Sequence, residues 1–137
     1  MSFKVLCPVD GTPHSLHAVA VAADLVAKYT GELSVCVVNV AHGGGRGPLI
    51  HHWTDAEAKA ILDGAVAEAE KNGAKSVHTA VVIDREAAAG IVGYAESRQI
   101  DQIVMGTGDK RGISRLMLGS VAADVAARAH CSVTIAR

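Results

Sequence analysis

The chain has 137 residues, half of them hydrophobic, and its formal net charge is −1. These values predict one globular domain, residues 1–137, with a buried core, and they argue against disorder. With no basic excess and only one Trp, two Tyr and one Phe, the sequence predicts no nucleic-acid surface and no polybasic membrane contact.

The three cysteines are widely separated and form no CxxC pair. Cys7 and Cys36 lie within apolar runs, which favours buried thiols over a redox role. The N-terminal residues show no signal-peptide pattern, and no apolar run is long enough to span a bilayer. The sequence therefore predicts a cytoplasmic protein.

The first predicted strand covers residues 3–9 and ends at the turn signal Asp10-Gly11. Thr12 is a predicted N-cap, and Pro13 suits the first position of a helix. Apolar residues then recur at the spacing of an amphipathic helix, at Val19, Ala22, Ala23 and Val26. We expect this helix to end at Gly31.

A second strand is predicted at residues 33–40, where the run is nearly continuous and β-branched. Residues 41–53 are glycine-rich, and we expect a mobile surface loop within one domain. Three histidines border this loop, at His42, His51 and His52, and they could gate a nearby cleft or bind a metal. A mobile polar loop is the ordinary interpretation.

The remaining elements also alternate between helices and strands. Thr54 to Glu57 is a capping box, and the helix that it begins should end at Gly73. Strands are predicted at 76–83, 101–106 and 132–136. Apolar residues at helical spacing predict a third helix, at Ala88, Ile91, Val92 and Ala95, and a fourth, at Ala122, Val125, Ala126 and Ala129. Five strands alternating with four helices predict an α/β fold with a parallel sheet and helices on both faces. Ligands of such sheets bind beyond the carboxyl ends of the strands.

The most distinctive motif is "MGTGDKRG", which contains Gly106, Gly108 and Gly112. A dinucleotide fingerprint is disfavoured, because it would follow the first strand and need an acidic residue at the end of the next. A Walker-type loop would need Gly-Lys-Ser/Thr, which is absent. A plain glycine-rich turn stays open beside a phosphate loop. Gly119-Ser120 begins the last helix, and a helix N-terminus attracts anions.

The chain resembles the universal stress protein family over essentially its whole length. The resemblance depends on "VLCPVDGTPHSLHAV", "VVNV", "IVMGTGDKRGISRLMLGSVA" and "CSVTIAR" in that order. It implies a three-layer sandwich with a five-stranded parallel sheet ordered 3-2-1-4-5. It also implies a homodimer that forms by antiparallel pairing of the last strands.

One branch of that family binds ATP through a motif written G-2x-G-9x-G-(S/T). Gly106 and Gly119-Ser120 match its two ends, but Asp109 replaces its second glycine, and Gly108 stands where a histidine is common. A carboxylate about 5 Å from a phosphate oxygen would repel it by roughly 3 kcal/mol at an effective dielectric near 20. Gly108 could restore backbone freedom, and Lys110 and Arg111 could offset the charge. Asp109 could also ligate a nucleotide-bound Mg²⁺.

The resemblance implies that Asp10 meets adenine or ribose, that Val40 backs the adenine and that Ser120 meets phosphate. From the residues alone, Asp10 could equally belong to a plain Asp-Gly turn. Val40 packs in the core in either case, and Ser120 could cap the helix as well as meet phosphate. The full implied nucleotide-binding set is Pro8, Val9, Asp10, Gly11, Thr12, Val40, Met105, Gly106, Gly108, Asp109, Gly119, Ser120 and Val121.

The leading interpretation is a universal stress protein that binds ATP or AMP, with or without Mg²⁺, as a sensor or regulator of the stress response. Two alternatives stay open: a dimerising partner-binding protein without a nucleotide, and a slow ATP hydrolase. No catalytic residue is predicted, because no nucleophile or general base can be identified. His14 and His17 are three residues apart but have no third metal ligand of clear spacing.

Overall fold

The computed structural model describes residues 2–107 and 119–137. In chain order the elements are β1 (Lys4–Pro8), α1 (Pro13–Tyr29), β2 (Glu32–Gly43), β3 (Leu49–His51), α2 (Asp55–Lys71), β4 (Val77–Asp84), α3 (Ala87–Ser97), β5 (Gln102–Gly106), α4 (Ser120–Arg128) and β6 (Ser132–Ala136). Of the described helices, none has the length and apolar character needed to cross a membrane.

Five of the strands form a parallel sheet in the order β4-β2-β1-β5-β6. This corresponds to the order 3-2-1-4-5 expected for five strands. The expected number of strands is wrong, because β3 is a sixth strand and pairs antiparallel with the end of β2. The sheet is therefore mostly parallel rather than wholly parallel.

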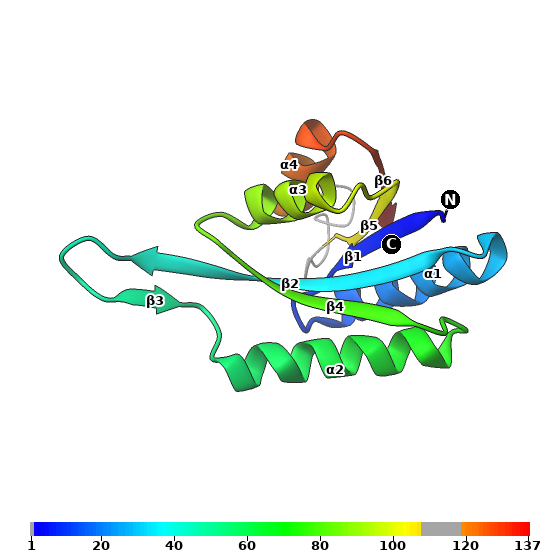
Figure 1. Ribbon diagram of the computed structural model, residues 1–137, viewed down its shortest axis with the longest axis horizontal. Helices are drawn as coiled ribbons and strands as arrows, with labels where there is room; N and C mark the ends of the chain where they lie inside the picture. Colours follow the sequence, from blue (N-terminus) through cyan, green and yellow to red (C-terminus); the bar gives the residue numbers. More distant parts are fainter. Residues whose placement is uncertain (1, 108–118) are drawn as a thin grey trace.

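Helices cover both faces of this sheet, so the fold has three layers (Figure 1). Successive residues of a strand point to opposite faces. On β1, Val5 packs into the core beneath α1 and α2, and Leu6 packs into the core beneath α3 and α4. Both side chains are fully buried, as expected for a strand in the middle of a doubly covered sheet.

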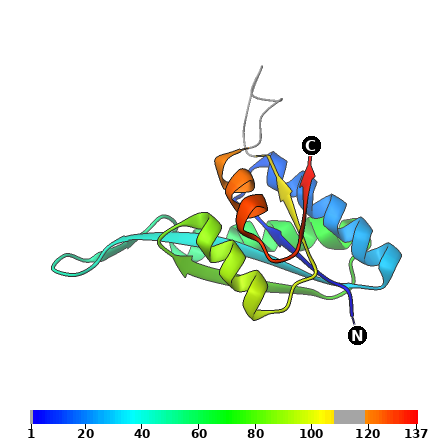
Figure 2. The same ribbon diagram turned by 90° about the horizontal axis from the view of Figure 1, so that it is seen from above.

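The glycine-rich stretch is a β-hairpin rather than the predicted loop, and we call residues 41–52 the arm. In its register Ala41 lies opposite His51, and His42 lies opposite Ile50. The arm projects well beyond the body of the molecule in both views (Figures 1 and 2). Gly43 has φ +86°, and a Cβ there would collide with the carbonyl oxygen of Pro48. The glycines thus form the hairpin turn. Because a glycine-rich stretch is typical of a loop, the sequence did not predict this hairpin.

The helix ends follow the sequence closely, with one exception. Thr12 caps α1 by accepting a hydrogen bond from the Ser15 backbone N–H, and Thr54 forms the predicted capping box with Glu57. The left-handed residue after α1 is Thr30, with φ 54°, and not Gly31. Gly31 is needed for another reason, because a Cβ there would lie 2.5 Å from the carbonyl oxygen of Phe3.

Candidate nucleotide-binding cleft

A cavity of about 540 Å³ opens at the carboxyl ends of the central strands, where the sheet topology places ligand sites. Its volume lies in the range of small-molecule sites. Residues of the predicted set that line it are Pro8, Val9, Asp10, Thr12, Val40, Met105, Gly106, Gly119, Ser120 and Val121. Segments far apart in sequence therefore meet at one cleft. Gly108 and Asp109 lie outside the described residues.

Gly11 belongs to the predicted set but does not line the cavity. It has φ +83°, and a Cβ there would lie 3.3 Å from a side-chain carbon of Ile61 on α2. Gly11, which was predicted to line the cleft, therefore contacts α2 instead of lining this cavity. Its backbone turns the chain from β1 towards α1. The side of Gly11 on which a Cβ would lie faces α2.

Asp10 lines the cavity, and the turn after β1 holds its carboxylate. Its Oδ1 accepts hydrogen bonds from the Thr12 backbone N–H, at 3.0 Å, and from Thr12 Oγ1, at 2.7 Å. The Asp10 N–H in turn donates to Ser15 Oγ at 3.4 Å. These bonds fix the carboxylate as a hydrogen-bond acceptor facing the cleft.

Two backbone segments also line the cavity, at Gly106 and at the start of α4. A Cβ on Gly106 would lie 2.6 Å from the carbonyl oxygen of His14 on α1. Only glycine allows β5 and α1 to approach so closely. Gly119 is the N-cap of α4 and makes no side-chain cap bond, and Ser120 begins the helix. The N–H groups and dipole of this helix end favour an anion in the cleft.

Between these polar ends the cavity is apolar. Val40 and Met105 were predicted to line it, and the structure adds Val38 from β2 together with Ala87 and Ile91 from α3. A planar apolar ligand group would be desolvated against these side chains. The α3 residues could not be assigned to the cleft by motif, because their spacing indicates only a helix face that packs on the sheet.

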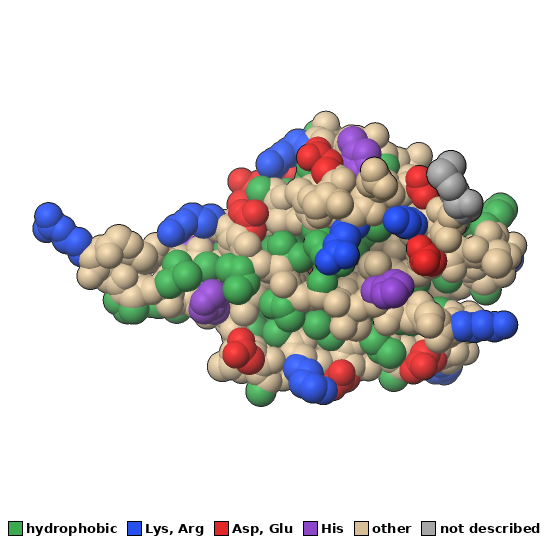
Figure 3. Space-filling view, in the orientation of Figure 1, with side chains coloured by type: hydrophobic (Ala, Val, Ile, Leu, Met, Phe, Trp, Pro, Cys, Tyr) green, Lys and Arg blue, Asp and Glu red, His purple; other side chains and the backbone are tan. Residues whose placement is uncertain are grey.

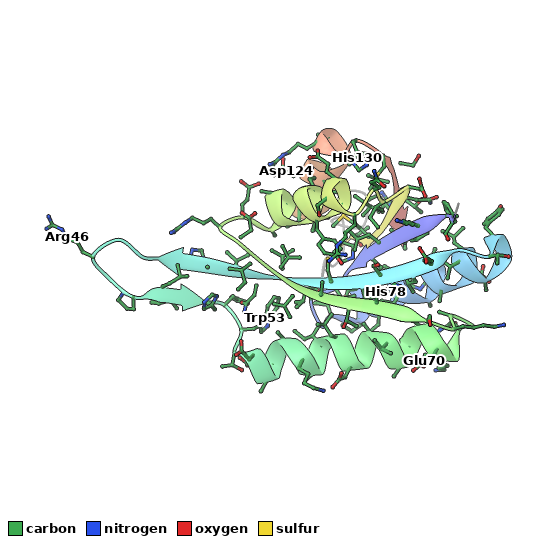
Figure 4. All side chains as sticks on the ribbon, viewed as in Figure 1. Arg46, Trp53, Glu70, His78, Asp124 and His130 are labelled. Carbon is green, nitrogen blue, oxygen red and sulfur yellow. The ribbon has the colours of Figure 1, made fainter. Side chains whose placement is uncertain are left out.

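The base of the arm closes the remaining side. His42, His52 and Trp53 line the cavity, and the rings of His52 and Trp53 meet edge to face at 4.7 Å. Figure 4 shows Trp53 between the base of the arm and the start of α2. The buried Asn39 side chain donates to the Trp53 carbonyl and accepts from its N–H, both at 2.9 Å. Asn39 therefore fastens the arm to β2.

The cysteines do not line this cavity. Burial raises the pKa of the Cys36 thiol to about 12, and burial together with the neighbouring Cys36 raises the pKa of Cys7 further. Both thiols stay protonated near neutral pH, so they are core residues and not nucleophiles. Within residues 2–107 and 119–137, no group of three His, Cys, Asp or Glu side chains is arranged to hold a metal ion.

The fold and the cleft define an α/β protein with a concave site at the carboxyl ends of its parallel strands. The chain belongs to the universal stress protein family, whose family model matches residues 1–137. It is 34% identical to universal stress protein MJ0531 of Methanocaldococcus jannaschii over 140 residues, which cover 98% of this chain and 81% of that protein. The predicted family is confirmed.

Solved structures show the same fold with nucleotides bound. One is a universal stress protein in complex with cAMP, with a TM-score of 0.77 and 26% identity, covering 98% of this chain and 95% of the other. Another is the universal stress protein from Archaeoglobus fulgidus in complex with dAMP, with a TM-score of 0.76 and 25% identity, covering 100% of this chain and 98% of the other.

Proposed function

We propose that this protein binds an adenine nucleotide in the cleft and acts as a sensor or regulator in the stress response. The observation that carries the proposal is one cavity that joins a fixed carboxylate, an apolar slot and a helix N-terminus. Two structural relatives with adenine nucleotides bound support it. The proposed role is binding and not catalysis, in the cytoplasm.

In this proposal each part of the nucleotide has a distinct place. The adenine occupies the apolar slot against Val40 and Met105, and the ribose or adenine donates a hydrogen bond to Asp10. The phosphate lies between Gly106 and the start of α4, where Ser120 offers a hydroxyl. Each contact matches what the side chain or backbone can supply: apolar surface, an acceptor, and donors at a positive helix end.

The test is a titration with AMP, cAMP and ATP, with and without Mg²⁺, followed by calorimetry and by tryptophan fluorescence. Trp53 is the only Trp in the chain and lines the cavity, so its emission should change when the site fills. GMP and inorganic phosphate serve as controls for the base and the phosphate. The proposal fails if no adenine nucleotide binds at millimolar concentration.

Asp109, which lies outside the described residues, bears on the choice of nucleotide. We expect Asp109→Gly to strengthen ATP binding by up to about 100-fold, because a carboxylate near a phosphate repels it by roughly 3 kcal/mol. AMP should gain less, since it carries less charge. Calorimetry with both nucleotides measures this, and weaker ATP binding in the variant would instead favour Asp109 as a ligand of nucleotide-bound Mg²⁺.

The arm histidines give a matched comparison. The hairpin register places His42 and His52 on one face, which lines the cleft, and His51 on the other. We expect His42→Ala and His52→Ala each to weaken AMP binding about 3- to 10-fold, as for one lost polar contact. His51→Ala should bind as the wild type does. Equal losses in all three variants would mean that the arm acts only through its general stability.

We also propose a homodimer that pairs through β6, as the family resemblance implies. Removal of Ser132 to Arg137 should then give a smaller assembly or an unfolded chain, because Ser132–Ala136 is the strand that pairs with β5 and would pair across the dimer. Sedimentation velocity and circular dichroism distinguish these outcomes. A truncated chain that stays folded and forms an assembly of the same size as the wild type would contradict pairing through β6.

A further inference from the structure

The outer edge of β4 is a long strand edge that faces solvent. Among the described strands β4 pairs only with β2, along Val77–Asp84. Val81 is 48% exposed and Ile83 is 58% exposed, although both are apolar. Figure 3, which looks onto this side of the molecule, shows hydrophobic side chains across the middle of the face. Apolar groups gathered at an unpaired edge indicate a surface that another chain covers.

Edge strands are usually protected by shortness, by proline or by lysine. The eight residues of β4 include neither Lys nor Pro. The edge strand on the other side of the sheet, β6, has five residues, and its Val133 and Ile135 are half-buried. The apolar exposure at β4 is therefore a feature of this edge and not a general feature of the sheet.

The sequence of β4 is complementary to itself when two copies run antiparallel about a two-fold axis at Val81. This pairing places the following residues opposite one another: Val81 and Val81, Ala80 and Val82, Thr79 and Ile83, and His78 and Asp84. Side chains that face each other directly across an antiparallel pair interact, and like charges there are unfavourable. Here no like charges meet.

Each of these pairs fits the chemistry of its two members. Val81 and Ile83, the two exposed apolar side chains, are covered by Val81 and Thr79 of the second copy. The imidazole of His78 can donate a hydrogen bond to the Asp84 carboxylate, and the two-fold axis makes this pair twice. Oδ1 of Asp84 already accepts from the Arg85 N–H at 2.7 Å, so its carboxylate is held in a fixed position.

We infer that the β4 edge is a self-association surface, where a second copy of this chain adds its own β4 antiparallel with Val81 at the two-fold axis. The inference does not depend on nucleotide binding. It is also separate from pairing through β6, because β4 and β6 are the opposite edges of the parallel sheet. A chain that uses both edges forms assemblies larger than a dimer.

Disulfide trapping tests both the surface and its register. In a Cys131→Ser background, Val81→Cys places two thiols at the axis, where directly opposed Cα atoms lie about 4.5–5.5 Å apart, within disulfide range. Thr79→Cys is the matched control, since Thr79 is exposed on the same face of the same strand. In the inferred register, the thiols that Thr79→Cys introduces on the two copies lie about 13 Å apart along the strand and cannot join.

We expect Val81→Cys to form a disulfide-linked dimer at micromolar protein under mild oxidation, at least ten times faster than Thr79→Cys. The double variant Thr79→Cys/Ile83→Cys should also cross-link, because these positions face each other. Equal cross-linking of Val81→Cys and Thr79→Cys, or none in either, overturns the inference. If the β4 edge binds a different protein instead of a second copy, we expect this result.

Sedimentation velocity of Val81→Lys gives an independent measure without oxidation. Two lysines would then oppose each other at the axis, and we expect the dissociation constant of the β4 contact to rise at least tenfold. Tyr29→Lys, at a side chain that is 66% exposed on α1, is the control for added charge. The inference is overturned if both variants sediment as the wild type does.

Discussion

Replacing Gly106 by alanine should lower the free energy of unfolding by about 1–3 kcal/mol and weaken nucleotide binding at least tenfold. The new Cβ would lie 2.6 Å from the carbonyl oxygen of His14 and 2.9 Å from its carbonyl carbon. Both are backbone atoms in the first turn of α1, so no rotamer change relieves the contact. The helix start must move, and with it Thr12 and the Asp10 carboxylate that Thr12 holds.

Gly93→Ala is the matched control for this change. Gly93 lies within α3, and a Cβ there meets no atom within 4 Å. Alanine is favoured over glycine inside a helix, so this variant should be more stable than the wild type by roughly 0.5–1 kcal/mol. Urea denaturation and AMP titration of the two variants make the comparison. If Gly106→Ala has wild-type stability, the close approach of β5 and α1 does not constrain the cleft.

The sequence was informative where the signal is local. Thr12 and Thr54 were predicted as caps from the residues that follow them, because a cap is satisfied within one turn of helix. The strands and helices followed from the periodicity of buried side chains, such as Val19 and Val26 on α1. The end of the cleft at Gly106 and Gly119 was indicated by glycines whose spacing resembles a family motif.

The sequence failed where the cause is a contact between distant segments. The arm was predicted as a loop because its strand-forming segments are short and its glycines favour a loop. β3 forms only by pairing with β2. Trp53 was not assigned to the cleft, since its position depends on the side chain of Asn39. Ile91 was predicted only as one position of a helical pattern, and such a pattern does not tell which of its residues line a cavity.

Asn39→Leu should lower the free energy of unfolding by about 2–4 kcal/mol and release the arm from the cleft. Asn39 is 3% exposed, and its amide satisfies both the N–H and the carbonyl of Trp53. Leucine fills a similar volume but leaves two backbone groups without these bonds, each at a penalty of roughly 1–3 kcal/mol where water is excluded. Because water can reach part of this site, we expect the loss of stability to be smaller than the sum of two full penalties.

Three measurements detect whether the arm is released in Asn39→Leu. Urea denaturation gives the stability, Trp53 emission should shift to the red as the ring gains water, and proteolysis should cut the arm faster. Asn72→Leu is the control: Asn72 bonds Glu68 at the end of α2, so its loss should cost about 1 kcal/mol and leave Trp53 emission unchanged.

Asn39→Asp separates the effects of the two hydrogen bonds between the Asn39 side chain and the Trp53 backbone. The carboxylate can still accept from the Trp53 N–H, but it cannot donate to the Trp53 carbonyl and it places a charge in a buried site. We expect a stability loss at least as large as that of Asn39→Leu, with Trp53 emission closer to the wild type. If the shape of the side chain alone held the arm, the Trp53 emission of both variants would stay at the wild-type value. If the donor bond alone held it, the emission of both variants would shift equally.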